Sequence, residues 1–125
     1  MALKSELFRN DPKLQACAIS NPAHITKGAT GPHVGKLQIA LRNLDRAVID
    51  SGELSAQRYG NSTAVAVLKY KERRNIINKA YQSAADDIVG IMTIARMDSD
   101  MVEFEANNAL KLVALRPFRC AIAES

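Results

Sequence analysis

One apolar stripe constrains the fold of this chain more than any other feature of its sequence. Apolar side chains recur three and four residues apart, at Val34, Leu37, Leu41, Leu44 and Val48. This spacing places them on one face of a helix. Gly31 and Pro32 mark the helix start and the pair Ser51-Gly52 marks its end, so the sequence predicts a helix over residues 32–50.

Further helices are predicted on both sides of this one. They cover residues 12–19, 61–73, 90–98 and 100–114. Asp11 followed by Pro12 is typical of a capped helix start, and Pro117 is expected to stop the last helix. Residues 75–85 are expected to form a long loop and residues 115–123 an extended tail. No convincing pair of strands is present, so little sheet is expected.

The composition fits one globular domain. The chain has 125 residues, of which 47% are hydrophobic and 24% charged. A chain of this size buries about two-thirds of its unfolded surface and needs no metal or disulfide to fold. Tryptophan is absent, so the core is expected to rest on aliphatic side chains and methionine.

The basic residues are spread along the chain, and only Lys71, Arg73 and Arg74 form a tight cluster. The formal net charge is +4. A dedicated nucleic-acid binder concentrates such charge on one stripe, so no nucleic-acid partner is expected. Two interpretations of the cluster remain open: a solvated helix face, or a surface that attracts an anionic polymer.

The two cysteines, Cys17 and Cys120, lie in opposite terminal segments. They either form a disulfide that closes a large loop or are two small buried apolar residues. A zinc site that combines them with His24 and His33 has the right ligand types but lacks the close pair spacings of such sites. We therefore expect no bound metal and no cofactor.

Neither an export signal nor a membrane span is visible. The first 20 residues lack the continuous apolar core of a secretory signal, because Asp11 and Pro12 interrupt them. No stretch approaches the roughly 20 apolar residues of a membrane span, so no membrane insertion is expected. If the protein acts outside the cytoplasm, another element must export it; the alternative is that residue 1 is not the natural start.

Three segments begin alike, at a period of about 30 residues that is within the range of repeat architectures. They are Gly31-Pro32-His33-Val34, Gly60-Asn61-Ser62-Thr63 and Gly90-Ile91-Met92-Thr93. Each opens with glycine, which permits a sharp turn and close approach of loop backbones. Each has a β-branched residue three positions later, which can pack under the loop or, if threonine, bond a free backbone group.

These segments resemble the type 1 peptidoglycan-binding domain in three ordered blocks over about residues 31–98. The first block is Gly31, Val34, Leu37, Gln38 and Leu41. The second is Tyr59, Gly60, Thr63, Ala66, Val67 and Tyr70. The third is Asp86, Ile88, Val89, Gly90 and Thr93. Residues 86–95 are also similar to a divergent branch that occurs as the leading module of larger bacterial toxins, including effectors of the type VI secretion system.

The resemblance implies an all-α fold with a compact three-helix core over residues 31–98. Residues 1–30 then form an N-terminal extension with a short helix, and residues 99–125 form a C-terminal helix and tail. The chain departs from the family at Asp87, where glycine is preferred, and at Lys71, where glutamine is preferred. These departures, with a longer segment before the third block, can reshape or remove a ligand groove.

In the family, the loops that enter the second and third helices border a shallow groove. Its expected ligand-binding rim in this chain is Tyr59, Gly60, Thr63, Asp86, Gly90 and Thr93. Tyr59 offers a ring that can stack on a sugar, and the two threonines can donate to a peptide carbonyl. Structural interpretations stay open beside these: a core tyrosine, threonines that bond their own helix starts, and Asp86 as a turn acid.

No catalytic constellation is visible in the sequence. Asp86-Asp87 and Asp98 with Asp100 are paired acids, but neighbours in a turn do not converge on one bond as glycosidase carboxylates do. The chain has no nucleophile motif and no phosphate loop. We therefore expect a protein that is not an enzyme.

The function implied by the resemblance is binding to bacterial peptidoglycan, through glycan or stem peptide, to target an attached protein or domain to the cell wall. The expected location is the periplasm or cell wall after export, and the cytoplasm before it. The alternative is a protein-interaction adaptor of a secreted bacterial effector that uses the same scaffold without glycan binding, since a fold does not fix a function.

Overall fold

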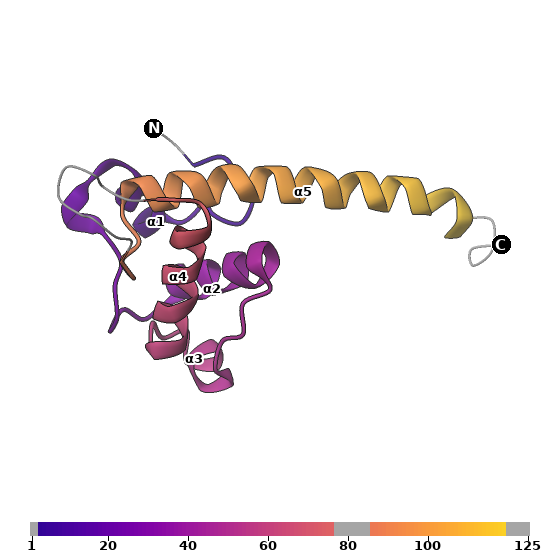
Figure 1. The fold of residues 1–125 in the computed structure, drawn as a ribbon. Helices are drawn as coiled ribbons and strands as arrows, with labels where there is room; N and C mark the ends of the chain where they lie inside the picture. Colours follow the sequence, from indigo (N-terminus) through magenta and orange to yellow (C-terminus); the bar gives the residue numbers. More distant parts are fainter. Residues whose placement is uncertain (1–2, 77–85, 120–125) are drawn as a thin grey trace.

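The computed structural model describes residues 3–76 and 86–119, and the chain is mostly helical there (Figure 1). Its elements are α1 (Pro12–Ile19), the short 3-10 helix η1 (Asn21–Ala23), α2 (Pro32–Asp45), α3 (Ser51–Ala56), α4 (Asn61–Arg73) and α5 (Ile91–Arg119). The described ranges have no strand and two isolated bridges, Ile25 with Val89 and Thr30 with Arg58. The all-α class expected from the sequence is confirmed.

Helix α5 is the longest of the helices, and α1 and α2 pack against it. It runs along one side of the molecule, and its carboxyl-terminal half extends beyond the other helices (Figure 1). Helices α1 and α2 both contact α5, and α4 contacts α2. One hydrophobic cluster lies among them, and it includes Leu3, Phe8, Leu14, Leu37, Leu41, Val67, Tyr70, Ile94 and Met97. The segment expected as an N-terminal extension therefore packs into the same core as residues 31–98.

Two carboxylates of α5 bind the backbone of the N-terminal segment. Asp98 accepts hydrogen bonds from the N–H groups of Lys4 and Ser5, at 2.9 and 2.8 Å. Glu105 accepts from the next two N–H groups along the chain, at 2.9 and 3.1 Å. These bonds satisfy donors of a segment that has no regular secondary structure of its own.

The prediction of two separate helices after residue 90 is wrong, because α5 is continuous to Arg119. Asp98 and Asp100 do not cap a break, since their carboxylates bond to other elements and, for Asp100, also to Arg96. Pro117 does not stop the helix before it. Its missing N–H removes one hydrogen bond in the last turn, where the helix ends anyway. The extended tail expected over residues 115–123 is wrong for residues 115–119, which continue α5, and residues 120–123 lie outside the described residues.

The starts of α1 and α4 agree with the sequence prediction. The Asp11 carboxylate accepts from the N–H groups of Lys13 and Leu14, at 3.0 and 3.1 Å, and so caps α1. Helix α4 spans the predicted residues 61–73. Of the loop predicted after it, residues 77–85 are not among those described.

Helix α2 ends at Asp45, earlier than the predicted residue 50. Arg46 takes a left-handed conformation with a φ of 52°, which terminates the helix. Val48 therefore leaves the apolar stripe and is 92% exposed. Ser51 and Gly52, expected to close this helix, instead begin α3, whose six residues are too few to show a helical period.

We expect Leu41→Ala to lower the free energy of unfolding by about 2–5 kcal/mol, because Leu41 is fully buried on the inner face of α2. Urea denaturation followed by circular dichroism measures this change. The matched control on the same helix is Ile39→Ala, at a side chain that is 46% exposed, with an expected loss below about 1 kcal/mol. A loss below about 0.5 kcal/mol for Leu41→Ala would contradict the core assignment.

Candidate functional site

The loops that enter α2, α4 and α5 lie side by side. Ile25 of the first loop and Val89 of the third exchange two backbone hydrogen bonds, each of 2.8 Å. The first and second loops are joined by the N–H of Gly28 to the Tyr59 carbonyl and the N–H of Tyr59 to the Ala29 carbonyl, each at 2.9 Å. The structure thus brings together the loops that precede the three similar segments of the sequence.

Tyr59 lies at the centre of these loops with its ring inside the protein. Its side chain is buried, at 1% exposure, and its hydroxyl donates a hydrogen bond to the Asp87 carbonyl. Burial, and then the charges of Asp87 and Asp86, raise the pKa of this phenol well above its usual value. The ring joins the second loop to the third and presents no face on which a sugar can stack.

Glu53 of α3 caps the start of α4. Its carboxylate accepts from the N–H groups of Gly60 at 3.1 Å and of Ser62 and Thr63 at 3.0 Å. The Thr63 hydroxyl donates to the same carboxylate at 2.8 Å. Donors in a first helical turn have no partner within the helix, and Gly60 offers no side chain to cap them. A Cβ on Gly60 would lie 2.6 Å from the Glu53 carboxyl carbon, so this approach requires glycine.

Gln38 extends the same hydrogen-bond network to α2. Its Nε2 donates to the Thr63 hydroxyl oxygen and to the Arg58 carbonyl, each at 3.0 Å. Burial by itself would raise the pKa of Glu53, but the hydrogen bonds from Ser62 and Thr63 outweigh it and lower the pKa to about 2. The carboxylate is therefore ionised at neutral pH, and Gly60 and Thr63 serve the junction of α2, α3 and α4.

An ion pair holds the third loop. The Lys71 ammonium pairs with the Asp86 carboxylate and also donates to the Ile88 carbonyl, at 2.8 Å. Both interpretations of the basic cluster required Lys71 at the surface, but the side chain is only 7% exposed. Its long aliphatic stem lies in the interior while the charge meets a carboxylate, which is the usual arrangement for a buried lysine.

The remaining residues of the expected rim divide between the interior and the surface. Thr93 is buried, at 2% exposure. Gly90 is half-buried, and a Cβ added there would meet no atom within 4 Å. The side chains of Tyr59, Thr63 and Thr93 are therefore enclosed, and the solvent-accessible part of the expected rim is Asp86 and the backbone of Gly90.

The basic cluster at the end of α4 is engaged by carboxylates. Arg74 pairs with Asp45 and with Asp100, each at 2.9 Å. Arg73 lies 3.6 Å from Asp45. Since Lys71 is buried against Asp86, these charges do not form the single cationic face that one interpretation of the sequence required.

An open cleft of about 350 Å³ lies beside the first loop, between α1 and the start of α2. Its lining combines basic and apolar side chains, which include Lys13, Ala16, His24, Ile25, Lys27 and His33. Lys13 and Lys27 are exposed, and neither forms an ion pair with another described residue. Burial, and then the charge of Lys13, lower the pKa of His33, so this imidazole is neutral at pH 7. The lining therefore supplies two lysine charges beside apolar side chains.

Sequence reasoning did not identify this cleft. Lys13 and Lys27 lie in the segment expected to be an extension, and their spacing does not distinguish them from solvated lysines. The one available signal was a stretch of chain breakers around Asn21-Pro22 and Gly28, which predicts an exposed loop and no particular ligand.

The residues weighed for zinc binding do not converge in the described part of the chain. No group of three or more histidine, cysteine, aspartate or glutamate side chains is placed there to hold a metal ion. Cys17 is buried, and its thiol donates to the Val89 carbonyl at 3.4 Å. Burial raises the pKa of that thiol to about 11. Cys120 is outside the described ranges, so the two alternatives for the cysteines stay open.

Comparison with protein-family models, with curated proteins and with solved structures finds no match to this chain. None of the helices in the described ranges combines the length and the apolar character that spanning a membrane requires. The family resemblance seen in the sequence therefore stays a prediction.

We expect Glu53→Gln to remove a stabilisation that depends on pH. The pKa of Glu53 is lowered from 4.5 to about 2 in the folded protein, so its ionised form stabilises the fold above pH 4.5. This contribution is lost as the pH falls from 4.5 towards 2. At pH 7 the substitution is expected to lower the free energy of unfolding by about 2–4 kcal/mol.

Urea denaturation at about pH 7 and about pH 3 tests this expectation, since the gap between wild type and variant should narrow at the lower pH. Glu103→Gln is the matched control, because Glu103 is exposed on α5 and its substitution should change stability by less than about 0.5 kcal/mol at either pH. A gap for Glu53→Gln that is the same at both values would show that the carboxylate charge is not the stabilising feature.

Proposed function

We propose that this chain is a non-catalytic module that binds bacterial peptidoglycan and targets an attached protein or domain to the cell wall. The observation that carries the proposal is the cleft beside the first loop, whose lining combines Lys13 and Lys27 with apolar side chains such as Ala16 and Ile25. The ligand surface is then the outer side of the converging loops. The enclosed side chains of Tyr59 and Thr63 stabilise the fold through their hydrogen bonds.

The chemistry of peptidoglycan stem peptides fits this cleft. They carry free carboxylates together with small aliphatic side chains. A lysine ammonium is a mobile point charge with three donors, which suits a carboxylate presented on a flexible polymer. The apolar part of the floor includes Ala16 and Ile25, and these side chains suit the methyl groups of a peptide.

The interaction is expected to be weak and sensitive to salt. The cleft is open, and most polar contacts made there replace contacts with water. A dissociation constant between about 10 μM and 1 mM corresponds to roughly −4 to −7 kcal/mol. Many weak sites along one insoluble polymer still retain a protein, because attachment through repeated contacts exceeds the affinity of each.

We expect the purified protein to sediment with purified insoluble peptidoglycan at low ionic strength. The double substitution Lys13→Ala, Lys27→Ala should reduce the retained fraction several-fold, about 1 kcal/mol, because it removes both charges of the cleft. Raising the salt should reduce the retention of the wild type, since exposed charges are screened.

The matched control is Lys4→Ala, Arg9→Ala, which removes the same charge at exposed side chains outside the cleft. It should be retained like the wild type. Wild-type protein that stays in the supernatant at low salt contradicts the proposal and favours the adaptor alternative. Equal losses for the two double variants would show a general charge effect and no site at the cleft.

A further inference from the structure

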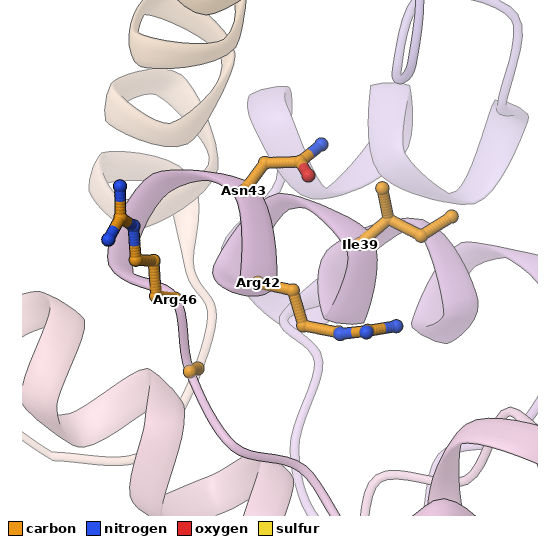
Figure 2. A pocket seen from close by; sticks show the side chains of 5 residues that line it. Ile39, Arg42, Asn43 and Arg46 are labelled. Carbon is orange, nitrogen blue, oxygen red and sulfur yellow. The ribbon is translucent and has the colours of Figure 1, made fainter.

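A second surface is formed by the outer side of α2, the residues that follow it and one face of α4. We call it the α2–α4 surface. Its residues are Ile39, Arg42, Arg46, Val48, Val65 and Lys69. Two hollows, of about 420 and 200 Å³, lie on it and share Arg46 and Ala47 in their linings. Figure 2 shows Ile39, Arg42, Asn43 and Arg46 projecting from the carboxyl-terminal half of α2 and the turn that follows it.

Aliphatic side chains are unusually open to solvent on this surface. Ile39 is 46% exposed, Val48 92% and Val65 50%. A single exposed aliphatic residue is ordinary, but these three line the same pair of adjoining hollows. Burying them against a partner would remove apolar area from water at no loss to the fold.

The exposed charged side chains of the surface are all cationic. Arg42, Arg46 and Lys69 form no ion pair with another residue in the described ranges. The carboxylate among the lining residues belongs to Asp45, whose side chain is 8% exposed and pairs with Arg74. The surface thus presents unneutralised cations around an aliphatic patch.

We propose that the α2–α4 surface docks a short acidic, amphipathic segment of a partner protein. Its carboxylates meet Arg42, Arg46 and Lys69, and its apolar side chains cover the aliphatic patch. An amphipathic helix laid in a groove is a recurring form of such recognition. A nucleic acid would satisfy the cations but leave Val48 uncovered, and neither hollow is lined by an aromatic side chain on which a base could stack.

This docking is independent of peptidoglycan binding, since the two surfaces share no residue. A module that targets a protein to the cell wall must contact both that protein and the wall. The α2–α4 surface therefore allows the module to bind a partner protein non-covalently, in addition to any covalent attachment.

The test uses a labelled synthetic peptide of about five helical turns, with leucines on one face and glutamates on the flanks. Fluorescence anisotropy measures its binding to the full chain at low salt. The wild type is expected to bind in the micromolar to sub-millimolar range. Arg42→Glu with Lys69→Glu should weaken binding by about tenfold or more, because like charges then face each other. Val48→Ser should weaken it several-fold without changing stability, because this side chain is exposed.

The matched control, Lys4→Glu with Arg9→Glu, makes the same charge change at exposed positions outside both hollows and should bind like the wild type. Three further probes separate other occupants: a peptide with serine in place of leucine, a single-stranded oligonucleotide and anionic lipid vesicles. Each should bind more weakly than the amphipathic peptide.

Several results would overturn the proposal. Absence of peptide binding at about millimolar protein would do so, and so would equal binding of the serine peptide together with a silent Val48→Ser. Preferential binding of the oligonucleotide or the vesicles would assign the surface to another class of partner. Self-association of the wild type that Val48→Ser abolishes would assign it to a second copy of the chain.

Discussion

The buried carboxylate of Glu53 is the interaction on which the arrangement of the helices most depends. It joins α3 to the start of α4, where the cap residue Gly60 has no side chain with which to accept the free N–H groups. A buried ionised carboxylate is tolerated only when its hydrogen bonds compensate for its lost hydration. Four donors do so here, and Gln38 of α2 bonds to Thr63 within the same network.

This network and the hydrogen bond from Tyr59 to the third loop determine which side chains remain accessible to a ligand. Side chains that join the loops to one another cannot also face outward. The outward surfaces lie instead beside the first loop and on the α2–α4 surface. Hydrogen bonds fix the first loop, which carries Lys27, and Lys13 lies on α1, so both lysines extend from an ordered backbone. Such order lowers the entropy that binding a ligand would have to overcome.

The sequence predicted the helices whose signals are local and periodic. The stripe Val34, Leu37 and Leu41 and the Asp11 cap are of this kind, and both are confirmed. Helix α3 was missed because six residues are too short to show a period. The continuity of α5 was missed because Asp98 is a helix-cap residue type whose carboxylate is used by a segment distant in sequence.

The site was harder to predict because its side chains also bond to segments that are distant in the sequence. Tyr59 and Lys71 are buried because they bond to the third loop. The residues next to them in the sequence give no sign of these bonds. The three similar segments did indicate that loops converge. They could not indicate which side chains would point inward, or that Lys13 of a terminal helix would border the resulting cleft.

The central claim is that the ligand binds in the cleft beside the first loop, and that the enclosed side chains of the other loops hold the fold. The most direct measurement is a two-dimensional NMR titration of the nitrogen-15-labelled chain with soluble stem-peptide fragments that carry free carboxylates. The account predicts progressive shifts at the amides of Lys13, residues 23–29 and His33, with the α2–α4 surface unaffected. No shift at about millimolar fragment, or shifts confined to other elements, would contradict it.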